Sequence, residues 1–244
     1  MIRFFFVCIG FFFVSCSLDR LDSCLEHNTN EIVQTINVPD FSKLNVSQGI
    51  QVEIIQHPIF KIEIAVGEKF QKYIEFNVVN HELFLKNNLT CTLGYTKPAI
   101  IKVFTPNLTD IYSNSQFNLY SKQTLNFPSL RIAQGITKSN ASCVFTLQIV
   151  SEHLVIETNN LSSFLLSGKT NHLAVRFFGG GARIQAQNLL ANHITIFHRS
   201  TNHMYLNAAE SIKGTIYGNG NVYLKEFPKV VEVSSINKGK LIKY

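Results

Sequence analysis

Three similar glycine-containing segments recur at a nearly constant spacing in the second half of the chain. They are Phe177–Ile184, Ile216–Tyr223 and Ser235–Ile242. The first two begin 39 residues apart and the last two 19 residues apart, so a unit of about 19 to 20 residues fits both steps. Self-similarity at a fixed period of this length is typical of stacked repeats. Such a chain buries its core between neighbouring repeats, so the period constrains the fold far more than the chemistry.

Aliphatic residues recur with a similar period from residue 108 onward. Most of them open a short alternating segment such as Leu130-Arg131-Ile132, and a second short segment such as Phe164-Leu165-Leu166 follows about ten residues later. Gly, Asn and Ser between the segments favour turns. Two strands per coil of about 20 residues predict an all-β fold, a right-handed parallel β-helix, with a β-sandwich as the alternative. The aliphatic anchors are Leu108, Leu130, Leu154, Leu173, Ile194, Ile212 and Val231.

The stretch from 36 to 107 lacks this period but alternates strongly. Ile50–Ile54 and Phe60–Val66 place apolar side chains at every second position, which predicts strands with one buried side. Glu68–Tyr73 is a candidate for a short helix. We expect these strands to form a small region that caps one end of a β-helix spanning 108–244, the two together making one domain over 36–244.

The first residues predict export from the cytoplasm. Arg3 is followed by the apolar run Phe4–Val14 and then by Cys16. A basic start, a short apolar stretch and small residues at its end are typical of a secretory signal and too short for a membrane span. The sequence before Cys16 resembles a bacterial lipobox, so we expect residues 1–15 to be a lipoprotein signal peptide and Cys16 to be acylated. The alternative is an ordinary signal peptide with an incidental cysteine.

Lipidation would tether the protein to a membrane surface through acyl chains such as palmitate. Residues 16–35 are polar and show no periodicity, so they are expected to form a flexible tether. Ser17 rather than Asp follows Cys16, which favours the outer membrane by the sorting rule of some bacteria. The predicted localisation is therefore the cell envelope, as an outer-membrane lipoprotein on its periplasmic face or exposed on the cell surface.

Composition narrows the possible partners and the redox chemistry. The net charge is +6, but the lysines are scattered and no arginine-rich run occurs, so nucleic acid is not expected as a partner. Beyond Cys16, the three cysteines Cys24, Cys91 and Cys143 cannot form a complete disulfide framework. Cys143 lies in an apolar segment and is predicted to be a small buried core residue. A Cys24–Cys91 bridge remains open.

Catalytic and metal-binding patterns are weak. Glycoside hydrolysis usually needs two carboxylates flanking the scissile bond, and no two acidic residues from 108 to 244 fall at matching places in adjacent coils. His193, His198 and His203 are spaced by five, which raises a zinc hypothesis against the simpler interpretation of polar coil residues. Gly179–Gly181 lacks the Lys-Ser/Thr of a phosphate loop and predicts a turn. We therefore expect no catalytic residue, no metal and no cofactor.

Several segments together resemble a known family. They are Val38–Val46 with Gly49–Ile54, then Ile101–Leu108, then Gly218–Tyr223 followed by Phe227–Val231. In order and spacing they are similar to the putative auto-transporter adhesin, head GIN domain family of bacterial lipoproteins, over roughly residues 36 to 244. The resemblance implies a right-handed β-helical fold preceded by strands, on the cell envelope. It implies no established activity and no functional residue.

These observations predict a non-catalytic envelope protein that serves in adhesion, binding a glycan or a surface protein, with homo-oligomers as a further possibility. Tyr205, Tyr217 and Tyr223 are the aromatic residues expected to make contacts, although tyrosines in strands also serve in packing. One alternative is a periplasmic or outer-membrane scaffold without a ligand. Another is a carbohydrate-active enzyme on a pectinase-like β-helix.

Overall fold

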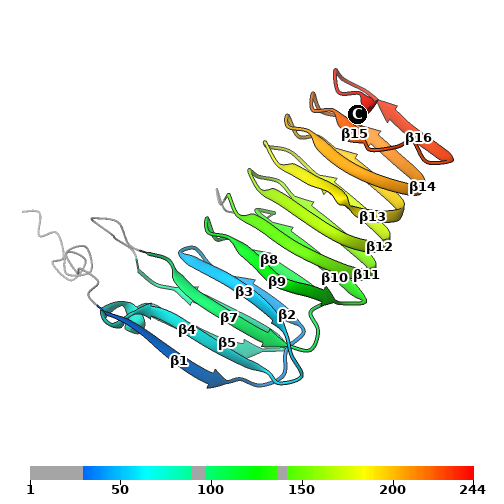
Figure 1. The fold of residues 1–244 in the computed structure, drawn as a ribbon. Helices are drawn as coiled ribbons and strands as arrows, with labels where there is room; N and C mark the ends of the chain where they lie inside the picture. The colour runs from blue at the N-terminus through cyan, green and yellow to red at the C-terminus, as the bar shows by residue number, and fades with distance from the viewer. Residues whose placement is uncertain (1–29, 90–96, 137–141) are drawn as a thin grey trace, which may run out of the picture.

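The computed structural model describes residues 30–89, 97–136 and 142–244 (Figure 1). Within them the protein is a parallel β-solenoid of about six turns with coils of about 21 residues, which confirms the predicted fold class. The coils stack along one axis, from the blue and cyan strands to the red C-terminal strands (Figure 1). The predicted lipidation site Cys16 and the cysteines Cys24 and Cys91 lie outside the described residues.

Four long strands build the middle of the solenoid. Each of them runs through both strand segments of a coil and pairs in parallel with the next. The pairing sets Leu154, Leu173, Ile194 and Ile212 side by side, as the anchor spacing predicted. These strands are β11 (Val144–Thr158), β12 (Ser163–Phe177), β13 (Arg183–His198) and β14 (Met204–Ile216).

Shorter strands continue the stack to the C-terminus. β15 (Val222–Leu224) pairs in parallel with β14 and with β17 (Leu241–Lys243), while β16 (Val230–Ser235) pairs with the other half of β14. The glycine segments from the sequence form turns between consecutive strands: β12 to β13, β14 to β15, and β16 to β17. Gly180, in the first of these turns, has a positive φ of 74°. The last anchor, Val231, lies beside Ile212 but is 43% exposed, because no described coil covers it. The other six anchors are at most 2% exposed.

The coil that comes first in the sequence lies inside the stack. β2 (Lys43–Val46) and β3 (Ile50–Gln56) pair in parallel with later strands on both sides. On one side lie β6 (Glu82–Asn87) and β7 (Ala99–Thr105), and on the other lie β8 (Asp110–Ser113) and β9 (Leu119–Asn126). β10 (Ser129–Gln134) follows beyond β8. The order of coils along the axis therefore differs from the order along the chain.

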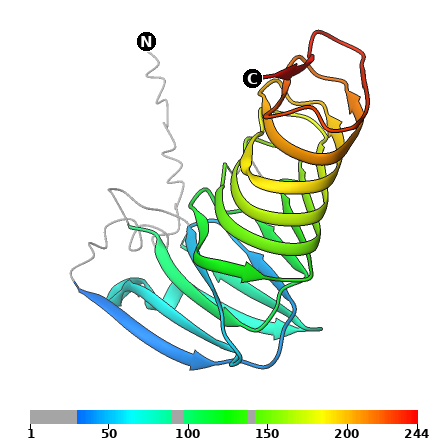
Figure 2. The same ribbon diagram turned by 45° about the vertical axis from the view of Figure 1, so that its right-hand side comes forward.

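Antiparallel strands close the N-terminal end of the stack. β1 (Glu31–Asn37) pairs with β4 (Lys61–Gly67), and β4 pairs with β7. β5 (Ile74–Val79) forms a hairpin with β6, and the predicted helix at Glu68–Tyr73 is present as the 3-10 helix η2. Figure 2 shows these blue and cyan strands at the base of the coils.

A file of aromatic rings fills part of the solenoid interior. Phe145 and Phe164 stack with ring centroids 4.9 Å apart, and Phe164 and Phe177 follow at 5.9 Å. All three side chains are fully buried. The next inward ring in this file is His198, which contacts Phe177 edge-on at 6.2 Å. Stacked inward side chains of this kind bind each coil to its neighbours, so a single coil is not expected to be stable alone.

Two glycines permit the sharp bends within the long strands. Gly168 in β12 has a φ of 112° and Gly214 in β14 a φ of 132°. A Cβ at Gly168 would overlap the carbonyl oxygen of Ile149, and one at Gly214 would overlap that of Ile196. Glycine is needed at both positions because other residues rarely adopt this backbone conformation and because the adjacent coil is too close.

Candidate binding groove

A polar groove crosses four successive coils on the outside of the solenoid. Its volume is about 340 Å³, and no ionisable side chain lines it. Amides and hydroxyls from β9, β11, β12 and β13 alternate there with a few aliphatic groups. The lining residues are Ser121, Thr146, Leu147, Gln148, Leu165, Leu166, Ser167, Gln185, Gln187 and Asn188. We call this surface the amide groove.

Two irregularities in strand pairing shape the amide groove. Leu165 pairs with Gln185, but Ser167 pairs with Asn188, so β13 carries one extra residue at this point. The pairing of β9 with β11 also shifts, between Thr146 and Gln148. Such bulges bend a strand and redirect its side chains, and they are common beside functional sites. Here they place amide side chains of β13 in a hollow rather than in a flat sheet.

Gln187 lies at the bulge in β13 and has an unsatisfied polar atom. Its Oε1 is buried and has no hydrogen-bond partner within the described chain. The backbone at this residue is held in place, because Asn207 Nδ2 donates a hydrogen bond to the Gln187 carbonyl oxygen at 3.3 Å. Buried amide oxygens are almost always hydrogen-bonded in proteins, so Gln187 Oε1 is an unusual unsatisfied acceptor beside the groove.

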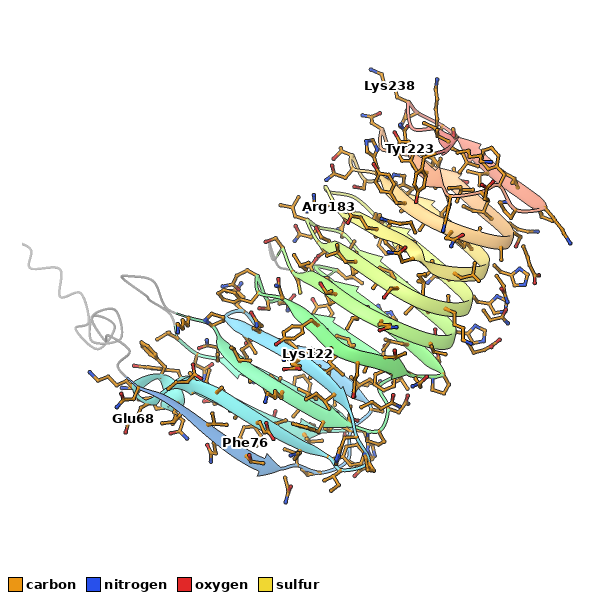
Figure 3. The ribbon with its side chains drawn as sticks, in the orientation of Figure 1. Glu68, Phe76, Lys122, Arg183, Tyr223 and Lys238 are labelled. Carbon is orange, nitrogen blue, oxygen red and sulfur yellow. The ribbon has the colours of Figure 1, made fainter. Side chains whose placement is uncertain are left out.

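Outward-facing side chains that pair from coil to coil lead from Gln185 in the groove to a cluster of tyrosines. The register places Gln185 beside Tyr205 and Tyr205 beside Tyr223. The two tyrosine rings stack at 4.9 Å with an angle of 10°, and Tyr244 contacts both edge-on. Because the ring faces cover each other, this cluster offers edges and hydroxyls rather than an open aromatic face. Figure 3 shows Tyr223 near the end of the molecule marked by Lys238, far from Glu68 and Phe76.

Tyr217, the third predicted contact, lies in a different cluster. Its ring packs against Phe197 at 4.9 Å, and Phe197 packs against Phe178 at 5.6 Å. The structure therefore brings two of the three predicted tyrosines together and separates the third. The amide groove was not predictable from the sequence, because it depends on bulges that leave no mark in the alternation of apolar and polar residues.

The structure does not bring the three evenly spaced histidines together. The described residues contain no group of three or more His, Cys, Asp or Glu side chains that could hold a metal ion. His193 lies on the surface with its Nδ1 3.0 Å from Ser211 Oγ, and His203 Nδ1 accepts a hydrogen bond from the Asn221 amide. His198 lies in the core. The odd spacing directs the side chains to different sides of the coil, as expected for strands.

His198 is a buried histidine whose pKa is strongly shifted. Burial lowers its pKa from 6.5 to about 4, although backbone groups of Gly220 and Asn202 act in the opposite direction. Within the described chain neither ring nitrogen has a hydrogen bond of ordinary geometry. The ring is therefore neutral at physiological pH and serves as part of the core.

The acidic residue most enclosed in the C-terminal coils is held by arginines. Glu157 lies 2.7 Å from both Arg131 and Arg176, and Arg131 also lies 3.5 Å from Asp110. Burial alone would raise the pKa of Glu157, but the hydrogen bonds from Arg176 and Arg131 outweigh it and hold the pKa below its usual value. A carboxylate clamped in this way links three coils and is poorly suited to proton transfer.

Cys143 is a buried core residue, as the sequence predicted. Its side chain is fully buried, it is free, and burial raises the pKa of its thiol to about 12. A thiol in this state is an inert core residue rather than a nucleophile. Separately, no helix in the described ranges is long and apolar enough to cross a membrane.

The fold and the groove define a β-solenoid protein with an uncharged polar hollow on its side. Residues 40–228 match the family described as "Putative auto-transporter adhesin, head GIN domain", and the chain belongs to that family, as its sequence predicted. By this description the family is one of adhesins of the cell envelope or cell surface, not a class of enzymes. A comparison with curated proteins finds no match.

Solved structures share the fold. A crystal structure described as a putative adhesin from Bacteroides fragilis has a TM-score of 0.78 and 20% identity, covering 88% of this chain and 97% of that chain. One described as a putative lipid binding protein from Parabacteroides distasonis has a TM-score of 0.63 and 13% identity, covering 89% and 98%. A putative adhesin from Parabacteroides merdae has a TM-score of 0.57 and 17% identity, covering 89% and 97%. At these identities the likeness shows the fold alone.

Proposed function

We propose that this protein is a lipid-anchored adhesin of the cell envelope that binds a glycan in the amide groove. The observation that carries the proposal is the groove itself, which is hollow, free of ionisable side chains and lined by amides and hydroxyls. Sugar hydroxyls both donate and accept hydrogen bonds, and amide side chains do the same.

The shape of the groove favours an extended neutral chain over a compact charged ligand. The groove crosses four coils, which in a β-structure follow one another at about 4.8 Å. A glycan lying along it would meet one set of polar groups per coil. Membership of a family described as adhesins supports a binding role of this kind. The matched carboxylates that an enzyme on this fold would need were not found in the sequence, and Glu157 is held by arginines.

Glycan-array screening of the Cys16→Ser chain would test the groove. Replacing Gln185 or Gln187 by Ala should weaken binding of any neutral glycan hit by roughly tenfold, because each loses a hydrogen bond worth about 1 to 1.5 kcal/mol. Gln71→Ala is the matched control, since Gln71 is a half-buried amide bonded to Gln34 outside the groove. Unchanged affinity in both groove variants, or the absence of any glycan hit, would count against the proposal.

Protease treatment of intact cells would test where the protein is displayed. Removal of the protein from intact cells supports adhesion at the surface. Protection until the outer membrane is broken would instead favour a scaffold or binding role in the periplasm. In both cases Cys16 is proposed to carry the lipid. The last residues of the stretch 16–35 expected as a tether belong to β1, which begins at Glu31, so the proposed tether shortens to residues 16–30 ahead of the solenoid.

A further inference from the structure

Three histidines form a continuous stack on the outside of successive coils. The His153 and His172 rings lie 5.0 Å apart with an angle of 13°, and His172 and His193 lie 5.0 Å apart with an angle of 24°. The strand register places all three side by side, with Ser129 before them and Ser211 after them. We call these three residues the histidine ladder. It shares no residue with the amide groove.

A second polar column runs directly beside the histidine ladder. Asn171 Nδ2 donates to Glu152 Oε1 at 2.6 Å, and Asn192 Nδ2 donates to Asn171 Oδ1 at 3.0 Å. The amides are thereby fixed in one orientation, and the carboxylate of Glu152 is already engaged at one end. At the other end Glu210 lies 3.5 Å from His193 Nε2. Within the described chain, His153 and His172 have no ion-pair partner.

Two adjoining hollows border these columns. One of about 360 Å³ is lined by Asn192 together with Lys169 and Glu152, and one of about 550 Å³ is lined by His193 together with Lys213 and Lys229. Because Asn192 and His193 are neighbours, the hollows follow each other along the solenoid axis. An elongated ligand could therefore occupy both and lie along the histidine ladder.

The charges around the histidine ladder balance when the imidazoles are neutral. Lys169, Lys213 and Lys229 line the hollows, and the acidic groups facing this region are Glu152, Glu210 and Glu232, the last bonded to Lys213 at 3.1 Å. Ser129 and Ser211, which end the column, add no charge. Each imidazole of the ladder that takes up a proton adds one positive charge to this balanced surface.

We propose that the histidine ladder is an acid-activated binding site for an acidic polysaccharide that runs along the solenoid axis. Three imidazolium rings with adjacent centroids 5.0 Å apart would repel one another. The carboxylates of Glu152 and Glu210, which already have hydrogen-bond or ion-pair partners, reduce this repulsion only at the two ends of the ladder. A ligand with carboxylates repeated along its length supplies the missing counter-charge at each coil. The lysines in the flanking hollows add attraction for the same ligand.

The test is the binding of polygalacturonate to the Cys16→Ser chain at pH 5.5 and 7.5, measured by titration calorimetry at fixed ionic strength. We expect at least tenfold tighter binding at pH 5.5 in the unmodified sequence. His172→Gln should reduce the ratio of the affinity at pH 5.5 to the affinity at pH 7.5. The triple change of His153, His172 and His193 to Gln should bring this ratio to one. His81→Gln removes a histidine outside the ladder, paired with Asp40, and should leave the ratio unchanged.

Far-ultraviolet circular dichroism at both pH values will show that each variant keeps its β-structure. Uncharged dextran serves as the ligand control and should show no pH-dependent binding at the ladder. Equal affinity at the two pH values, an unchanged ratio in the folded triple variant, or no binding of polygalacturonate at either pH would overturn the proposal. None of these outcomes depends on the amide groove, so the two sites are tested separately.

Discussion

Gly220 packs directly against the ring of His198. A Cβ at Gly220 would lie 2.8 Å from His198 Nε2 and would also overlap the carbonyl oxygen of Asn202. The turn that contains Gly220 therefore closes over the ring, which is fully buried. A glycine turn found in the sequence thus has a second role, because it seals a polar ring into the core of the neighbouring coil.

Acid should destabilise the protein through His198. Because burial lowers the pKa of the folded state to about 4, the unfolded chain with a pKa of 6.5 takes up the proton first. The stability from this neutral ring is complete above pH 6.5 and is lost progressively as the pH falls toward 4. Linkage predicts a loss of about 2 kcal/mol between pH 7 and 5 from this group. Urea unfolding at the two pH values measures it.

Replacing His198 by Phe provides the comparison, because Phe continues the interior file of aromatic rings and cannot be protonated. The difference in unfolding free energy between pH 7 and 5 should be smaller in His198→Phe by about 2 kcal/mol. His81→Gln, a change of an exposed histidine, should behave like the original sequence. Equal losses in His198→Phe and in the original sequence would show that other groups cause the acid sensitivity.

Replacing Gly168 by Ala should destabilise the solenoid strongly. The new Cβ would overlap the carbonyl oxygen of Ile149, and the backbone has a φ of 112°. Strain of this kind costs about 1 to 3 kcal/mol before the displacement of the neighbouring coil is added. Gly179→Ala is the matched control, because there the nearest atom belongs to the side chain of Asn159, which can move. Thermal unfolding should show a large drop in Tm for the first variant only.

Replacing Phe164 by Ala should remove the centre of the aromatic file. Phe164 contacts the rings of Phe145 and Phe177 on both sides and is fully buried. Large-to-small changes at such positions cost about 3 to 5 kcal/mol, whereas Phe164→Leu should cost clearly less because it leaves a smaller cavity. Urea unfolding of the three proteins gives the ranking. A similar cost for both variants would argue against cavity formation as the cause.

Replacing Cys16 by Ser should release the protein from the membrane. If Cys16 carries the acyl chains, the original sequence will incorporate radiolabelled palmitate and sediment with membranes, and Cys16→Ser will do neither. Cys24→Ser is the control and should remain in the membrane fraction. Labelling of Cys16→Ser at the level of the original sequence would show that the lipid is attached at another residue.

The repeating part of the fold was predictable because it depends on period. Leu154, Leu173 and Ile194 pair directly, as their spacing indicated, and the histidine ladder could have been found in the same way, since His153, His172 and His193 are 19 and 21 residues apart. The exposure of Val231 was not predictable from spacing, because burial at the end of a stack depends on what covers it.

Other features depend on pairings that periodicity does not contain. The place of β3 between β7 and β9 joins strands that are distant in sequence, and β3 shares no repeat signature with either. The amide groove depends on one extra residue between Gln185 and Asn188, and a shift of one residue redirects side chains without changing composition. Register and pairing order must therefore come from the structure.

The position of β2 and β3 within the stack has a consequence for how the chain acquires its structure. From β10 onward, each coil can form on a neighbour that precedes it in the sequence. Residues 43–56 cannot do so, because the strands on both of their edges come later, as far as Asn126. During synthesis from the N-terminus these two strands must wait with open edges for more than half of the protein. The start of the chain is thus expected to gain its protection from hydrogen exchange only after the middle has emerged.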